Sequence, residues 1–140
     1  MFQIEIVTFN DKTKKAIRFI RESVFIDEQK VPAELEFDGL DHSATHALIS
    51  IEGEYVGTGR LLNDGHIGRI AILKASRNQK IGSKLVLSLI EEAKHQGYSR
   101  VYLGSQTHAI GFYQKLGFNT FGEEFMEAGI AHLSMEKTLK

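Results

Sequence analysis

The chain has 140 residues, of which 42% are hydrophobic and 25% charged, and a formal net charge of -1, which predicts one globular domain over residues 1–140. It contains no cysteine, which excludes disulfides, thiolate nucleophiles and Cys-ligated zinc. We find no run of roughly 18 apolar residues and no signal peptide, so we expect a cytoplasmic protein that does not bind membranes.

Hydrophobic periodicity predicts alternating strands and helices along the chain. Strands are expected at residues 2–7, 44–51, 54–62, 66–73, 100–104, 118–125 and 130–139. Helices are expected at residues 12–28, 80–96 and 109–116, with an irregular, acidic segment at 30–43. Such a mixed α/β chain needs a central sheet with helices on its faces.

Two segments of the chain carry opposite charge. Six acids and one base lie between Asp27 and Asp41, whereas five bases and no acid lie between Arg69 and Lys84. Charge runs of this kind are either solvated faces or sites that hold a cation at one place and an anion at another.

The helix expected at 80–96 begins with bases. Arg77, Lys80 and Lys84 lie at or just before its first turns, where the helix macrodipole disfavours each cation by roughly 0.3–1 kcal/mol. A bound anion would offset this cost, because it would meet free backbone N–H groups as well as the basic side chains. Gly82 lets a bulky group approach the backbone, and donors spread over two turns suit a pyrophosphate. The alternative is an ordinary basic surface helix.

Other phosphate and metal motifs are absent from the sequence. A P-loop requires Gly-Lys-Ser/Thr, but the order at 82–84 is GSK. A dinucleotide-binding fingerprint fails because Leu62 stands where a third glycine would follow the Gly-Thr-Gly of residues 57–59. The six histidines are scattered, with no i, i+4 pair on an expected helix, so no metal site is expected.

The segment RNQKIG (77–82), between an expected strand and an expected helix, resembles the acyl-CoA-binding motif of the GNAT family of N-acetyltransferases. The family pattern is Gln/Arg-x-x-Gly-x-Gly/Ala; the first and last positions match, whereas Lys80 replaces the middle glycine. The segment AIGFYQKLGF (109–118) is similar to the family's late helix and following strand. Residues 24–46 resemble the N-terminal segment of a small bacterial subgroup, the YjcF- and ElaA-like acetyltransferases.

The resemblance implies a GNAT-like acyl-CoA N-acyltransferase fold, with a central mixed, mainly antiparallel sheet flanked by helices. It also implies acetyl-CoA as co-substrate, no metal, and direct acetyl transfer to an amine in a ternary complex, with pantetheine pairing along a strand edge. Tyr113 is the expected general acid, since an unperturbed tyrosine holds its proton at neutral pH. The expected coenzyme-binding residues are Ile70, Ala71, Ile72, Arg77, Asn78, Gln79, Lys80, Ile81, Gly82, Ser83, Gln106, Phe112 and Tyr113.

A base is needed as well, because presenting a lysine-like amine in its neutral form at pH 7 costs roughly 4–5 kcal/mol. Glu28 and Asp38 are the preferred candidates among the acids of the acidic segment, which also include Glu36 and Asp41. If residues 34–38 are extended, their acids share one side and form a rim that attracts a cationic substrate. The histidines at 46 and 108 are alternative bases.

The leading interpretation is an N-acetyltransferase acting on a small-molecule or peptide amine. A second is a non-catalytic acyl-CoA-binding sensor or interaction module, in which Lys80 has changed the site. A third, a nucleic-acid binder using the basic run, is disfavoured by the net charge of -1 and the single short patch. The identity of the amine and the oligomeric state, with a homodimer as one alternative, stay open.

Overall fold

The computed structural model describes residues 2–77 and 79–139. The strands are β1 (Phe2–Val7), β2 (Thr45–Ile51), β3 (Glu54–Leu61), β4 (Ile67–Ile72), β5 (Arg100–Gln106), β6 (Asn119–Glu127) and β7 (Ile130–Thr138). The α-helices are α1 (Lys14–Arg21), α2 (Ala33–Glu36), α3 (Ile81–His95) and α4 (Ile110–Lys115). A π-helical segment, η1 (Glu22–Glu28), continues α1, and short 3₁₀ turns are η2 (Asp41–Ser43), η3 (Lys74–Ser76) and η4 (Thr107–Ala109).

The first sheet is antiparallel, in the order β1-β2-β3-β4. Its two faces are covered by different helices, because inward-facing positions alternate along each strand. On one face, Leu48 and Ala71 pack with Ile17 and Ile20 of α1. On the other face, the apolar stripe of α3, which includes Leu85, packs in the larger core. The helices therefore fix β4 between two packed layers.

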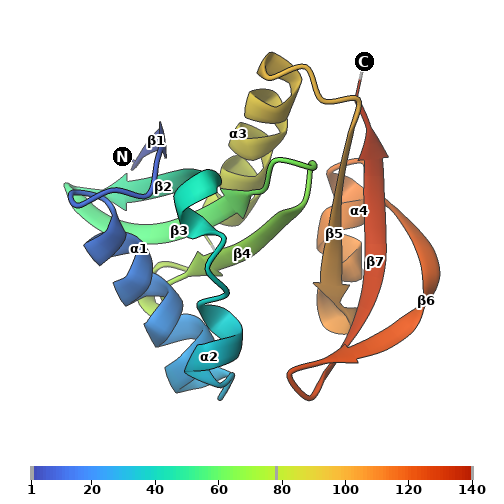
Figure 1. The fold of residues 1–140 in the computed structure, drawn as a ribbon, viewed down its shortest axis with the longest axis horizontal. Coiled ribbons are helices and arrows are strands. Elements are labelled where there is room, and N and C mark those ends of the chain that lie inside the picture. Colours follow the sequence, from blue (N-terminus) through green and yellow to red (C-terminus); the bar gives the residue numbers. More distant parts are fainter. Residues whose placement is uncertain (1, 78, 140) are drawn as a thin grey trace.

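The second sheet has the order β5-β7-β6, also antiparallel. Within the described residues, the chain just before β4 joins β5 in parallel at a single bridge between His66 and Tyr102, and the N–H of Tyr102 donates to the carbonyl of Gly65 at 3.1 Å. Beyond that contact the strands separate, and Figure 1 shows the two sheets side by side with β4 and β5 facing each other. This divergence positions the site described below.

The predicted elements are confirmed in order and type, and the mixed, mainly antiparallel sheet flanked by helices is confirmed in two parts. The helix expected at 12–28 divides, because the N–H of Gln29 reaches back to the carbonyl of Val24 and that of Val31 to Phe25, leaving η1 as a π-helix. None of the helices within residues 2–77 and 79–139 combines the length and apolar character that a membrane crossing requires.

Candidate active site

A cleft of about 850 Å³ lies where β4 and β5 diverge. One wall comes from η1, α2 and β4, and the other from β5, η4 and the β6–β7 hairpin. The cleft carries both apolar and ionisable side chains, so it can hold an extended ligand and also exchange protons with it.

The edge of β4 that faces the cleft is not paired with another strand beyond the His66 bridge, within the described part of the chain. The N–H of Leu73 donates to Val56 of β3 at 2.8 Å, and successive residues of a strand direct their backbone groups to opposite edges. The backbone groups of Ile72 and Ile70 therefore face away from β3. This open edge can pair with an extended ligand.

A β-bulge interrupts β4 at Arg69, where φ is 52° and the register with β3 shifts between Thr58 and Arg60. A left-handed conformation at a non-glycine residue costs on the order of 1 kcal/mol. The guanidinium of Arg69 lies 3.2 Å from a carboxylate oxygen of Glu36 and 3.2 Å from one of Asp38. These contacts hold the bulge and tie β4 to the segment around α2.

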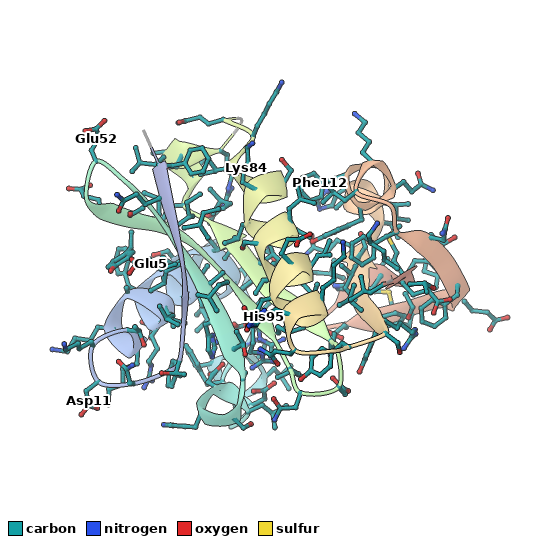
Figure 2. All side chains as sticks on the ribbon, turned by 90° about the horizontal axis from the view of Figure 1, so that it is seen from above. Glu5, Asp11, Glu52, Lys84, His95 and Phe112 are labelled. Carbon is teal, nitrogen blue, oxygen red and sulfur yellow. The ribbon has the colours of Figure 1, made fainter. Side chains whose placement is uncertain are left out.

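The N-terminus of α3 borders a second cavity, of about 610 Å³. Lys80 is the N-cap residue and is left-handed, with φ 63° and ψ 13°, a conformation that glycine adopts without strain. A Cβ on Gly82 would lie 3.6 Å from the Phe112 ring, and Figure 2 shows Phe112 beside the N-terminal end of α3. Lys115 of α4 also lines this cavity; the sequence alone gave no reason to select it. Basic side chains and a helix N-terminus fit the phosphates of a coenzyme.

Arg77, predicted to bind the coenzyme phosphates, forms an ion pair with Glu28, predicted to be a base. The Arg77 Nη1 and Nη2 donate to the two Glu28 carboxylate oxygens at 2.9 and 2.7 Å, and its Nε donates to the carbonyl of Ile72 at 2.9 Å. The hydrogen bonds from Arg77 lower the pKa of Glu28. The base role of Glu28 stays a prediction, and this ion pair weakens it.

Tyr113 of α4 lies between Phe112 and Phe118, with ring centroids 5.0 and 5.9 Å apart and edge-on packing. It also lines the cleft. Burial raises its pKa to about 12, so the hydroxyl carries its proton throughout the neutral range. This placement is suited to the predicted role of general acid.

A largely buried cluster of arginines and carboxylates forms part of the α2 wall of the cleft, which Glu36, Asp38 and Arg60 line. The Nε of Arg21 donates to Glu36 at 2.7 Å and its Nη1 to Asp41 at 2.6 Å. Arg60 donates to Asp38 at 2.9 Å from both Nη atoms and to Asp41 at 3.1 Å from Nη1. Together with Arg69, these residues form a continuous network that joins α1, α2, β3 and β4.

Arg21 and Arg60 are functional residues that the sequence does not predict, although one signal is present for Arg21. It follows Ile17 by four residues and therefore lies on the apolar face of α1. An arginine at such a position predicts a buried carboxylate partner. For Arg60 we find no comparable local signal, because its partners lie about twenty residues away along the chain.

Residues 34–38 are not extended, so the condition for an acidic rim on one side of this irregular segment is not met. The carbonyl of Pro32 accepts the N–H of Leu35 and of Glu36, so α2 is helical and Glu36 is buried. Three of the acids are thus matched by arginines instead of forming an open rim.

Ionisation within this network differs from one carboxylate to another. Burial raises the pKa of Glu36. Burial also acts to raise the pKa of Asp38 and of Asp41, but hydrogen bonds from Arg60 and from Arg21 outweigh it and lower both. A strongly stabilised Asp38 carboxylate is a weak proton acceptor, which counts against its predicted role as the base.

Most of the expected coenzyme residues line the two cavities. Gln79 lines neither, and Asn78 lies outside the described residues. The cleft contains Gln106, whose Nε2 donates to Gln29 at 3.0 Å. The residues found at one or both cavities are Ile70, Ala71, Ile72, Arg77, Lys80, Ile81, Gly82, Ser83, Gln106, Phe112 and Tyr113.

The two histidines weighed as bases lie in different places. His46 is buried against the carbonyl of Asp41 at 3.0 Å and does not line the cleft. His108 lies at the cleft with its Nε2 2.8 Å from Gln106 Oε1. Two further histidines, His66 and His132, also line the cleft. His66 directly precedes β4 and His132 lies in β7, so the tertiary structure brings together two residues that are far apart in the sequence.

Comparison with known proteins gives one consistent result. The domain family described as "Acetyltransferase (GNAT) domain" matches residues 9–139. The chain is 37% identical over 136 residues to an "Uncharacterized N-acetyltransferase YjcF" from Bacillus subtilis, covering 94% of this chain and 97% of that protein. Its fold is similar to the crystal structure of Escherichia coli ElaA, with a TM-score of 0.89, 29% identity and coverage of 98% and 99%. It is also similar to an acyl-CoA N-acyltransferase from Pseudomonas aeruginosa, with a TM-score of 0.88, 28% identity and coverage of 98% and 99%.

Proposed function

Since the chain belongs to the GNAT family of acetyltransferases, we propose that it transfers the acetyl group of acetyl-CoA directly to a primary amine in a ternary complex. The observation that supports this most strongly is the continuity of the site. The open edge of β4 ends at the loop that leads to α3, and Ile72 and Arg77 line both cavities. One extended, phosphate-bearing ligand can therefore contact both places at once.

Different residues would bind the pantetheine and the pyrophosphate of the coenzyme. The backbone of Ile70 and Ile72 would pair with an extended pantetheine, while Lys80, Lys115 and the first N–H groups of α3 would hold the pyrophosphate. When bound, acetyl-CoA supplies the thioester whose carbonyl carbon accepts the amine. A backbone N–H of the β4 edge is suited to polarise that carbonyl, and the Tyr113 hydroxyl is suited to protonate the leaving sulfur.

Coenzyme binding is tested by thermal unfolding with acetyl-CoA, CoA, ATP or no ligand, at two salt concentrations. At 100 times its dissociation constant a ligand adds about 2.7 kcal/mol to the free energy of unfolding, which raises the melting temperature by several degrees. We expect a shift with acetyl-CoA and CoA and little with ATP. No shift with either coenzyme would contradict the proposed site.

Catalysis is tested by acetylation of spermidine, glucosamine and a lysine-containing peptide, with Tyr113→Phe as the key variant. We expect this variant to bind CoA like the wild type and to lose kcat by about 100-fold, because only the donated proton is removed. Phe118→Leu, in the same aromatic group, serves as a packing control. Coenzyme binding without acetylation of any amine would instead favour the sensor interpretation. That interpretation is motivated by Lys80, which replaces the middle glycine of the family motif.

A further inference from the structure

His132 of β7 has a ring whose hydrogen-bonding geometry fixes its tautomer. Its Nδ1 lies 2.7 Å from the carbonyl oxygen of Ile130. A carbonyl can only accept a hydrogen bond, so Nδ1 carries the hydrogen and, in the neutral ring, Nε2 carries a lone pair. The residue is 8% exposed and lines the cleft. Among the described residues, none forms a hydrogen bond with Nε2.

The position of His132 within the second sheet places it on the cleft wall. It lies directly opposite Gln106 of β5 and Phe125 of β6, and directly opposite residues share a face of the sheet. Its ring stacks on Phe125, with centroids 5.6 Å apart and planes 21° apart. Gln106 and Phe125 also line the cleft. Packing therefore restricts the ring, so that Nε2 is presented at a defined place.

We propose that Nε2 of His132 is the base that removes a proton from the acceptor ammonium, and this rests on the proposed acetyltransferase function. The carboxylates nearby on the opposite wall are committed to arginines: Glu36 to Arg21 and Asp38 to Arg60. His132 has a free lone pair at the cleft, which neither of those carboxylates offers without breaking an ion pair.

The proton transfer balances as follows. The ammonium gives one proton to Nε2, producing an imidazolium and a neutral amine. The lone pair of the amine nitrogen forms the new C–N bond as the C–S bond breaks, and the sulfur takes the electron pair and the Tyr113 proton. The second amine proton returns to the Tyr113 oxygen, and the imidazolium releases its proton to solvent. The products are the amide and the free thiol, with both side chains restored.

Few other ionisable groups share this part of the wall. The elements packed against β7 are β5, β6 and η4, and their ionisable residues that line the cleft are Tyr102, Glu127 and His108. Apart from His132, the other ionisable residues of these elements and of β7 do not line it: Arg100, Glu123, Glu124, Glu136 and Lys137. Tyr102 donates to Asp64, His108 bonds Gln106, and Glu136 accepts from Arg100. Glu127 is exposed and lines the cleft on the same wall as His132.

The test is His132→Asn, because an asparagine amide nitrogen can replace Nδ1 as donor to Ile130 while nothing replaces Nε2. With the amine that the wild type acetylates best, we expect kcat/KM at pH 7 to fall about 100-fold. The decline of wild-type activity between pH 8 and pH 5, where a histidine changes charge, should disappear. His95→Asn is the control; this exposed histidine ends α3, far from Phe112 in Figure 2, and its substitution should leave activity unchanged.

Two outcomes separate this proposal from the function on which it rests. If the wild type is active and His132→Asn keeps both its rate and its decline in activity at acid pH, the role of His132 is overturned and the acetyltransferase function stays intact. If His66→Asn loses this decline instead, the base is His66 and not His132. Imidazole-ring NMR of the wild type provides a readout that needs no amine. We expect the Nδ1–H tautomer for His132, and an Nε2–H tautomer would overturn the proposal even if no amine is acetylated.

Discussion

Lys80 shows how one side chain can occupy a backbone position that is suited to glycine. The residue before α3 is left-handed, with φ 63°, where the chain turns into the helix. Glycine allows this turn without strain. In this chain the strained position is held by Lys80, which lines the second cavity. Backbone strain is therefore located at the site where the anion is proposed to bind.

We expect Lys80→Gly to raise the free energy of unfolding without ligand by about 0.5–1 kcal/mol. The substitution removes roughly 1–2 kcal/mol of left-handed strain and loses part of this gain to the greater entropy of glycine in the unfolded chain. The same variant should bind CoA more weakly, because the ammonium is gone. Urea unfolding and calorimetry measure the two effects. Lys80→Ala separates them: it should lose CoA affinity without gaining stability.

At the scale of elements, α1 contributes a buried arginine to the arginine–carboxylate network of the cleft wall as well as an apolar face to the core. Its residue Arg21 is 0% exposed and bridges Glu36 of α2 and Asp41 of η2. A buried charge is stable only when it is paired and hydrogen-bonded. The network therefore fixes the segment after Pro32, whose Leu35 and Leu40 remain exposed, against the first sheet. This segment is part of one wall of the cleft.

We expect Arg21→Met to reduce the free energy of unfolding by about 3–5 kcal/mol, because Glu36 and Asp41 would remain buried with one partner fewer. Chemical denaturation measures this loss. Arg18→Met is the matched control: Arg18 is an exposed residue of the same helix whose guanidinium lies 4.8 Å from the Phe37 ring centroid, and its loss should cost less than about 1 kcal/mol. Equal losses in the two variants would show that the network adds no stability.

At the scale of the whole molecule, two sheets are joined at one strand contact and diverge beyond it. The helices α1 and α3 hold the first sheet from both faces, while the arginine network fixes the wall opposite the β6–β7 hairpin. The cleft is thus the space between two sheets that diverge beyond a shared core, in which α3 packs with Val101 and Leu103 of β5 as well as with the first sheet. Its shape depends on ion pairs between elements, so the stability of the fold is coupled to pH.

We expect the free energy of unfolding to fall as the pH is lowered from about 5 to 3. Asp38 and Asp41 have lowered folded pKa values, so their contribution is complete above the unfolded pKa of about 4 and is lost as the pH falls through the folded values. Glu36 has a raised folded pKa and acts in the opposite direction, stabilising below its unfolded pKa.

Denaturant unfolding of Asp38→Asn across this pH range tests the assignment. The variant should be less stable than the wild type at pH 7, because Arg60 and Arg69 lose a charged partner, and the difference should shrink toward pH 3. Asp11→Asn is the control, since the Asp11 side chain is 100% exposed, and it should follow the wild-type curve. An Asp38→Asn curve parallel to the wild type would contradict the role of this carboxylate.

The sequence alone determined the order of elements, and it predicts the coenzyme end of the proposed site. Strand alternation, helical periodicity and the RNQKIG segment are local patterns, because hydrophobic period, turn chemistry and helix ends depend on residues close together in the chain. Only the tertiary structure shows how the side chains of the cleft are arranged. The pairing of Arg77 with Glu28, the burial of Arg60 among Asp38 and Asp41, and the placement of His132 on the cleft wall join residues from separate elements. Such contacts are set by strand order and by the cost of burying charge, which no local pattern records.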